Sequence, residues 1–220
     1  AGIWRYMPAD TPNRANSPLR EVRALANTQL LLTLLTAAIG FGGMFAIYTY
    51  LTSVLQNVTH VPEWRIMIYM VVCGAGMLIG ANAGAWLTDR NLDLAALVAL
   101  AGSAAVMLVF PMVLHNEAGL MLDVLLVPAF VNALGPALQT RLMDFAGDAQ
   151  TLAASLNHSA FNVANALGAS MGSFLLANRF GYGSLGVGGA MLSAGGLAVY
   201  LVALGVLRSR GMTEVRGPID

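Results

Sequence analysis

The chain has 220 residues, of which 57% are hydrophobic and 10% are charged, and its mean hydropathy is +0.69. A soluble domain carries about 25% charged residues, so this composition indicates a membrane protein. The 11 basic and 11 acidic residues balance to a formal charge of zero, which argues against nucleic acid as a partner. Cys73 is the single cysteine and lies in an apolar run, so we expect no intrachain disulfide and no thiol metal site. We also expect no cofactor.

Residues 1–24 form a polar lead-in with three prolines and four arginines, and six apolar segments follow it. Each segment approaches or exceeds the roughly 20 residues that a membrane-spanning helix needs. The segments are 27–52, 66–87, 94–114, 120–140, 152–177 and 185–207. We therefore predict an all-α membrane protein in which residues 25–208 form one six-helix bundle and residues 209–220 form a short tail.

The distribution of arginines predicts how the bundle is oriented. An even number of spans puts both termini on one side, and that side holds nine arginines against two on the other. The nine are Arg5, Arg14, Arg20, Arg23, Arg90, Arg141, Arg208, Arg210 and Arg216, and the two are Arg65 and Arg179. Because cytoplasmic loops are enriched in basic residues, both termini are expected in the cytoplasm.

The first and fourth spans carry aromatic, amide and hydroxyl side chains on faces that a central cavity would use. These residues are Thr36, Phe41, Met44 and Tyr48 on the first span and Asn132 and Gln139 on the fourth. Such a lining suits an amphipathic or weakly polar small molecule. The alternative is that the aromatic side chains only pack and that the two prolines of the fourth span only kink it.

The third and sixth spans are almost purely apolar, whereas the other four contain polar residues. We therefore expect the third and sixth spans to face lipid and the other four to surround a polar interior. Because the same pattern occurs in each set of three spans, two three-helix repeats are predicted, a common plan among transporters.

The fifth span carries a polar stripe although residues 149–177 contain no charged side chain. Ser155, His158, Asn162 and Asn165 recur at steps of three and four residues, so they share one helical face. Amides and imidazoles are costly in hydrocarbon, so this face must meet protein or a water-filled cavity. A polar stripe of this kind favours a transport path over a simple anchor.

Two residues are candidates for carrying a proton. His158 lies deep in its span and its imidazole can exchange a proton, although a neutral histidine bonded within the bundle is the alternative. Asp123 lies near the outer end of the fourth span, where we expect water to reach it. No charged residue is predicted at a span centre, so the main ion-carrying residue of a coupled transporter is expected elsewhere.

Two blocks of sequence resemble a known family. The pattern G-x-G-x-x-x-G-x-N-x-G followed by A-W-L-T-D-R, at residues 74–90, resembles the loop motif of the major facilitator superfamily. Residues 141–168 are similar to the fifth-span signature of its drug/proton antiporter branch. The likeness is to bacterial arabinose-efflux-permease-like and chloramphenicol-resistance-like exporters.

This resemblance implies the C-terminal half of a twelve-span transporter of the bacterial inner membrane. Its partners would be a missing N-terminal six-span half, the lipid bilayer, protons, and a small substrate such as a drug, sugar or metabolite. The loop motif would supply the gating residues Gly84, Asp89 and Arg90, with Asp89 near a helix N-terminus of the opposite half. The chain departs from the motif at Ala85, Leu92 and Asp93.

Two rival interpretations remain open. A stand-alone six-span protein acting as a homodimer would pair the polar stripe with itself. An intramembrane hydrolase would need a nucleophile, a base and an acid close together, and the sequence offers no such set. The G-x-S-x-G pattern at residues 168–172 lies in the middle of a span, so it is expected to serve close helix packing. We therefore do not expect an enzyme.

Overall fold

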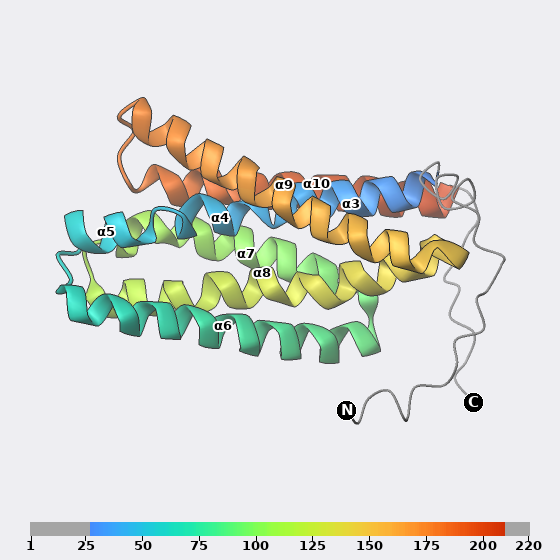
Figure 1. The fold of residues 1–220 in the computed structure, drawn as a ribbon, viewed down its shortest axis with the longest axis horizontal. Helices are drawn as coiled ribbons and strands as arrows, with labels where there is room; N and C mark the ends of the chain where they lie inside the picture. Colours follow the sequence, from blue (N-terminus) through green and yellow to red (C-terminus); the bar gives the residue numbers. More distant parts are fainter. Residues whose placement is uncertain (1–26, 210–220) are drawn as a thin grey trace, which may run out of the picture.

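The structure is a computed structural model that describes residues 27–209, apart from the side chain of Asp148. The expectations for the lead-in and for the tail beyond Ser209 lie outside the described residues. The described part is helical without strands, and six stretches are long and apolar enough to cross a membrane (Figure 1). The prediction of an all-α, six-span membrane fold is confirmed.

The first span consists of three helices, α3 (Thr28–Gly40), α4 (Gly42–Tyr48) and α5 (Leu51–Asn57). The remaining spans are one helix each, with the short 3-10 helix η1 (Gly147–Ala149) between the fourth and fifth. They are α6 (Glu63–Arg90), α7 (Leu92–Val113), α8 (Glu117–Ala146), α9 (Gln150–Ala177) and α10 (Ser184–Ser209). The first span was predicted as one uninterrupted segment over 27–52, so its two breaks are a finding of the structure.

Asparagines begin three of the helices. The side-chain oxygens of Asn27, Asn91 and Asn116 accept hydrogen bonds from backbone N–H groups in the first turns of α3, α7 and α8. Such caps satisfy donors that have no partner within the helix. Gly147 ends α8 with a φ of 54°, a backbone conformation that glycine adopts without steric cost.

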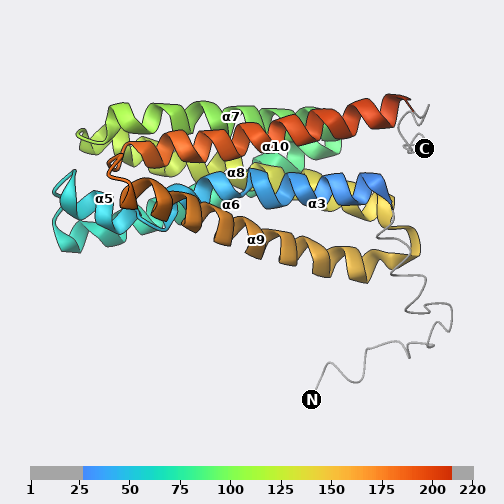
Figure 2. The same ribbon diagram turned by 90° about the horizontal axis from the view of Figure 1, so that it is seen from above.

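The first span is the central element of the bundle. In the most apolar 18-residue stretch of each span, 72% of residues are buried in the first span, against 22% in α6 and 22% in α9. The first span lies between α9 and α10, and α10 also packs against α7 (Figure 2). The outer helices α6 and α9 therefore carry the most open surface.

Three glycines, four residues apart, bring α6 and α8 into backbone contact. A Cβ atom at any of them would collide with a carbonyl oxygen of α8. The colliding pairs are Gly76 with Leu125, Gly80 with Ala129, and Gly84 with Ala133. Small residues at this spacing let two membrane helices approach closely. We call these three contacts the glycine ladder.

The structure corrects the predicted end of the fourth span. Helix α8 continues to Ala146, so only the three residues of η1 connect it to α9. Arg141 was counted as a loop arginine, but it lies inside α8 and its side chain is buried. Removing it from the count still leaves eight arginines against two, so the predicted orientation keeps its basis.

Candidate functional site

The polar stripe of α9 lies on an open face of the bundle. His158, Asn162 and Asn165 are all exposed, whereas Ala160 and Ala164 on the same helix are buried against the rest of the bundle. Among the described residues, none forms a hydrogen bond with the side chains of these three. The alternative of a histidine bonded within this bundle is therefore not supported by the described part of the chain.

The packed face of α9 meets the first span through glycines. A Cβ atom at Gly168 would collide with the carbonyl oxygen of Gly42, and one at Gly172 would collide with the ring of Tyr50. The Tyr50 hydroxyl donates a hydrogen bond of 3.0 Å to the carbonyl oxygen of Ala169. The glycines of the G-x-S-x-G pattern thus serve close packing, as the sequence predicted.

An aromatic cluster borders the stripe. The ring of Phe161, next to Asn162, makes edge-to-face contacts with Phe41 at 5.4 Å and with Phe45 at 5.2 Å between centroids. Phe161 is partly exposed, while the two rings of the first span are buried. The predicted residue Phe41 therefore supports an exposed aromatic surface beside the amides. Thr36 is fully buried, and its hydroxyl donates to the carbonyl oxygen of Leu32.

The amides of α8 are occupied by contacts within the bundle. Asn157 Nδ2 of α9 donates to Gln139 Oε1 at 2.6 Å, which joins α9 to α8. Asn132 Nδ2 donates to the carbonyl oxygen of Pro128 at 2.9 Å and lies 3.8 Å from the sulfur of Met44. Sequence reasoning did not single out Asn157, although its place beside His158 in a polar run was a usable signal.

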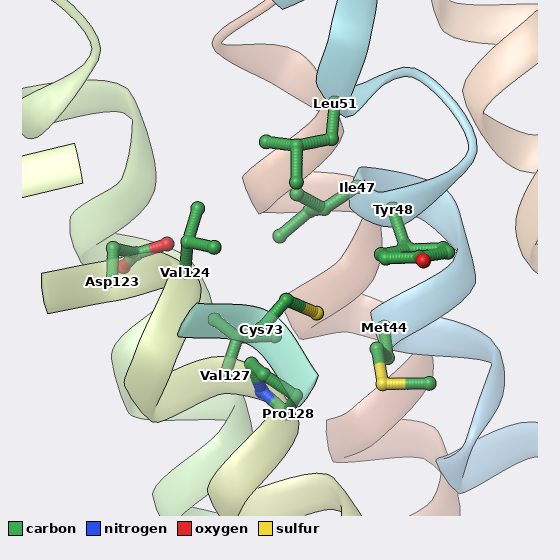
Figure 3. Close-up of a pocket in the computed structure, with 9 residues that line it drawn as sticks. All are labelled: Met44, Ile47, Tyr48, Leu51, Cys73, Asp123, Val124, Val127 and Pro128. Atoms are coloured by element: carbon green, nitrogen blue, oxygen red, sulfur yellow. The ribbon is translucent and has the colours of Figure 1, made fainter. Parts of the chain in front are cut away.

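A small cavity of about 20 Å³ lies between the first span and helices α6 and α8. Figure 3 shows the residues around it, which come from α4, α5, α6 and α8. They are Met44, Ile47, Tyr48, Leu51, Cys73, Asp123, Val124, Val127 and Pro128. Two of the predicted cavity residues, Met44 and Tyr48, are therefore brought together here with the predicted coupling residue Asp123.

Asp123 differs from what the sequence suggested. Its relative exposure is 4%, so the expectation that water reaches it is wrong in this conformation. Neither carboxyl oxygen has a hydrogen-bond partner among the described residues. The reason is local: Asp123 lies on a buried side of α8 beside the cavity, and its neighbours Val124 and Val127 are buried with it.

A buried polar network at the other end of α8 was missed entirely. Arg141 Nη1 donates to Asp93 Oδ1 at 2.9 Å and to the Tyr200 hydroxyl at 3.1 Å, and Nη2 donates to Gln29 Oε1 at 3.3 Å. The Tyr200 hydroxyl in turn donates to Asp93 Oδ1 at 2.7 Å. These four residues join α8, α7, α10 and α3. Isolated polar residues at the ends of apolar segments were the available signal.

The residues assigned to the loop motif lie at the end of α6. Gly84 is buried as the last step of the glycine ladder, while Asp89 and Arg90 are exposed. The Arg90 guanidinium stacks over the Trp86 ring at 3.4 Å from its centroid. Within the described residues Asp89 forms no ion pair, so its role toward an opposite half stays a prediction.

Comparisons with known proteins agree with this architecture. A family model described as Major Facilitator Superfamily matches residues 2–169. The "Inner membrane transport protein YdhP" of Escherichia coli (strain K12) is 36% identical over 183 residues, covering 83% of this chain and 46% of that protein. The "Chloramphenicol resistance protein" of Streptomyces lividans is 30% identical over 229 aligned residues, covering 100% of this chain and 55% of that protein.

A third relative, the "Uncharacterized MFS-type transporter YfhI" of Bacillus subtilis (strain 168), is 26% identical over 198 residues, which cover 90% of this chain and 50% of that protein. The chain thus spans about half the length of the curated relatives it matches. With its six membrane-spanning helices and the matching family model, the chain belongs to the major facilitator superfamily, whose members are membrane transporters and not enzymes.

Proposed function

We propose that this chain is the C-terminal half of a secondary transporter that exports a small molecule in exchange for protons by alternating access. The observation that carries the proposal is the uncharged polar stripe of α9, His158, Asn162 and Asn165, which lies exposed on the bundle. An amide or imidazole facing lipid without a hydrogen-bond partner is costly. The stripe therefore requires a cover of protein or water, which a second six-span half would supply.

The second half would dock on the two most open helices. Helices α6 and α9 are the least buried spans, and each carries exposed polar side chains, such as Asn82 on α6. Transporters of this architecture move one bundle against the other around a site near the middle of the membrane. In this arrangement Asp89, at the end of α6, would meet a helix N-terminus of the partner half.

The substrate class follows from the exposed surface beside the stripe. Phe161 supplies an aromatic edge, and Asn162 and Asn165 supply amide donors and acceptors without a formal charge. A mostly apolar site with a few polar groups suits an amphipathic or weakly polar molecule. One relative is named as a chloramphenicol resistance protein, and this name supports export of a small organic compound. The protein would lie in a bacterial inner membrane with both termini in the cytoplasm.

Reconstitution tests the proposal. The chain alone, in liposomes with a proton gradient and a fluorescent amphipathic substrate, should show no coupled flux. Co-expression with an N-terminal six-span half, taken from the Escherichia coli relative or from the genomic neighbourhood of this chain, should restore export. Robust coupled transport by the isolated chain would favour the homodimer and overturn the proposal, and so would inactivity of a correctly assembled pair.

A further inference from the structure

We propose that Asp123 is a proton-binding site of this chain: its carboxyl group holds a proton while it is buried, as in this structure, and releases the proton when the first span moves and admits water. The binding part of this proposal depends only on the chain itself. The coupling part, in which the proton exchanged at Asp123 drives export, rests on the proposed function.

Burial without a partner implies the neutral form. Asp123 is 4% exposed, and no described residue donates a hydrogen bond to either of its oxygens. An ionised carboxylate in such surroundings would lose its hydration without compensation, and a buried carboxyl group in that position takes up a proton instead. By contrast, Asp93 in the same bundle is paired with Arg141 and bonded by Tyr200. The two aspartates therefore serve different purposes.

Other titratable groups leave Asp123 unpaired. Cys73 of α6 and Tyr48 of α4 line the same cavity, but neither is a cation. On the same helix, Glu117 is paired with Arg65 of α6 at 2.8 Å, and its carbonyl oxygen accepts a bond from Tyr69. Helix α3 has no titratable residue. The titratable residue of α7 is Asp93, which lies at the opposite end of the bundle from Asp123.

His158 is the titratable residue of α9, and it lies at another depth of the bundle. Its neighbour Asn157 bonds Gln139, which follows Asp123 by sixteen residues of α8. At 1.5 Å per residue this separation is roughly 24 Å along the helix. A proton on Asp123 therefore has no direct contact with the stripe of α9, and any coupling between them needs a connecting element.

The cavity beside Asp123 suits a proton and not a metal cation. Its volume of about 20 Å³ is close to the space that one water molecule requires. Among the nine lining residues, side-chain oxygens come from Asp123 and Tyr48, while Met44 and Cys73 contribute sulfur. A hard cation such as Ca²⁺ takes about six to eight oxygen ligands. The lining cannot provide such a shell, whereas a proton needs a single carboxyl oxygen.

One wall of the cavity includes the ends of two successive helices of the first span. Tyr48 ends α4 and Leu51 begins α5, and both line the cavity, so the break between the two helices adjoins it (Figure 3). Interrupted membrane helices are typical of ion and substrate sites in transporters. The opposite wall, between α6 and α8, is held by the glycine ladder. Bending at the break would therefore admit water to Asp123 beside the partly exposed Tyr48.

The residue at the break, Tyr50, also contacts α9, the helix that carries the polar stripe. The Tyr50 hydroxyl donates to the carbonyl oxygen of Ala169, and its ring lies against Gly172 of the same helix. A shift of α9 on substrate binding would consequently pull on the segment between Tyr48 and Leu51, which line the Asp123 cavity. This linkage gives substrate and proton a physical route to influence each other, because both act on one movable element.

Infrared spectroscopy of the purified chain in lipid nanodiscs tests the binding part. At neutral pH the spectrum should contain the C=O band of a protonated carboxylic acid that shifts in D₂O. Asp123→Asn should remove this band, and Asp144→Asn, an exposed aspartate on the same helix, should leave it unchanged. Asp123→Leu provides a second variant that removes the acid without adding a donor. A spectrum in which both Asp123 variants retain the wild-type band would overturn the proposal.

Transport by the assembled two-half protein tests the coupling part. Asp123→Asn should reduce the rate of proton-driven export at least tenfold, while the exchange of substrate for substrate across the membrane is preserved. Unimpaired proton-driven export by this variant would overturn the coupling role, and so would export driven equally well by a sodium gradient. Absence of any substrate flux in the unmodified pair would instead contradict the proposed function, and the infrared result would still stand.

Discussion

Arg141 and Asp93 form an ion pair at 2.9 Å that joins the C-terminal part of α8 to the first turn of α7. The two side chains differ in environment, because Arg141 is almost fully buried and Asp93 is one-third exposed. Tyr200 bridges them from α10, and Gln29 holds the second guanidinium nitrogen from α3. Four helices thus meet at one charged group, which gives the first prediction.

Asp93→Asn should lower the free energy of unfolding by about 3 kcal/mol, the scale of breaking a buried ion pair. The loss follows because Arg141 would stay buried without its counter-ion. Asp144→Asn is the matched control, since that carboxylate is exposed on the same end of the bundle. Thermal unfolding in detergent measures both variants. Equal melting temperatures for Asp93→Asn and the unmodified chain would show that the pair contributes nothing to stability.

The glycine ladder gives the second prediction. Gly80→Ala should destabilise the bundle by about 2 kcal/mol, because its Cβ would collide with the backbone of Ala129 and force α6 away from α8. Gly74→Ala on the same helix should be neutral or slightly stabilising, since nothing lies within 4 Å of the added atom. The comparison uses thermal unfolding of the two variants. Similar behaviour of both would indicate that the helices have room to separate.

The third prediction concerns the polar stripe. Asn162→Leu or Asn165→Leu in the assembled two-half transporter should reduce export at least tenfold while membrane insertion stays normal. These changes remove hydrogen-bonding groups from the open face of α9 without adding charge. Val163→Leu, also exposed on α9 but off the stripe, should retain export. If all three variants lost export alike, general disturbance of packing would explain the result.

The fourth prediction concerns orientation. In a Cys73→Ser background, His115→Cys should react with an impermeant thiol reagent added outside intact cells, and Gln150→Cys should react only after the membrane is opened. Both positions are exposed and lie at opposite ends of the bundle, and neither is a capping asparagine. The expectation rests on the arginine excess at the end of the bundle that holds Gln150. The reverse labelling pattern would show that the termini face outward.

The number of spans and their approximate positions were predictable because hydrocarbon imposes them directly. A run of about 20 apolar residues is recognisable without knowledge of its neighbours. The breaks in the first span were not, because Phe41, Thr49 and Tyr50 are compatible with a continuous helix. Close packing of Gly42 and Gly43 on neighbouring helices accompanies the first break, and this packing depends on residues far along the chain.

Within the candidate site, periodicity predicted which residues of α9 share a face, since helical geometry fixes that relation. It gave no measure of burial against other helices. Asp123 was expected to contact water but is buried. Arg141 was expected in a loop but is buried in a hydrogen-bond network. Both errors concern contacts between helices, which the pattern of a single helix does not contain.

The glycine ladder has a consequence for the evolutionary record of this fold. The closest approach at each of its glycines is to a backbone oxygen of α8, and the one α8 side chain near an added Cβ is Pro128, 3.1 Å away at Gly76, so side chains of α8 contribute little to the collisions. A change of side chain on α8 would therefore call for no compensating change on α6. Because residue covariation arises where two side chains must adjust to each other, we expect the tightest helix pair of this bundle to leave only a faint trace of coevolution.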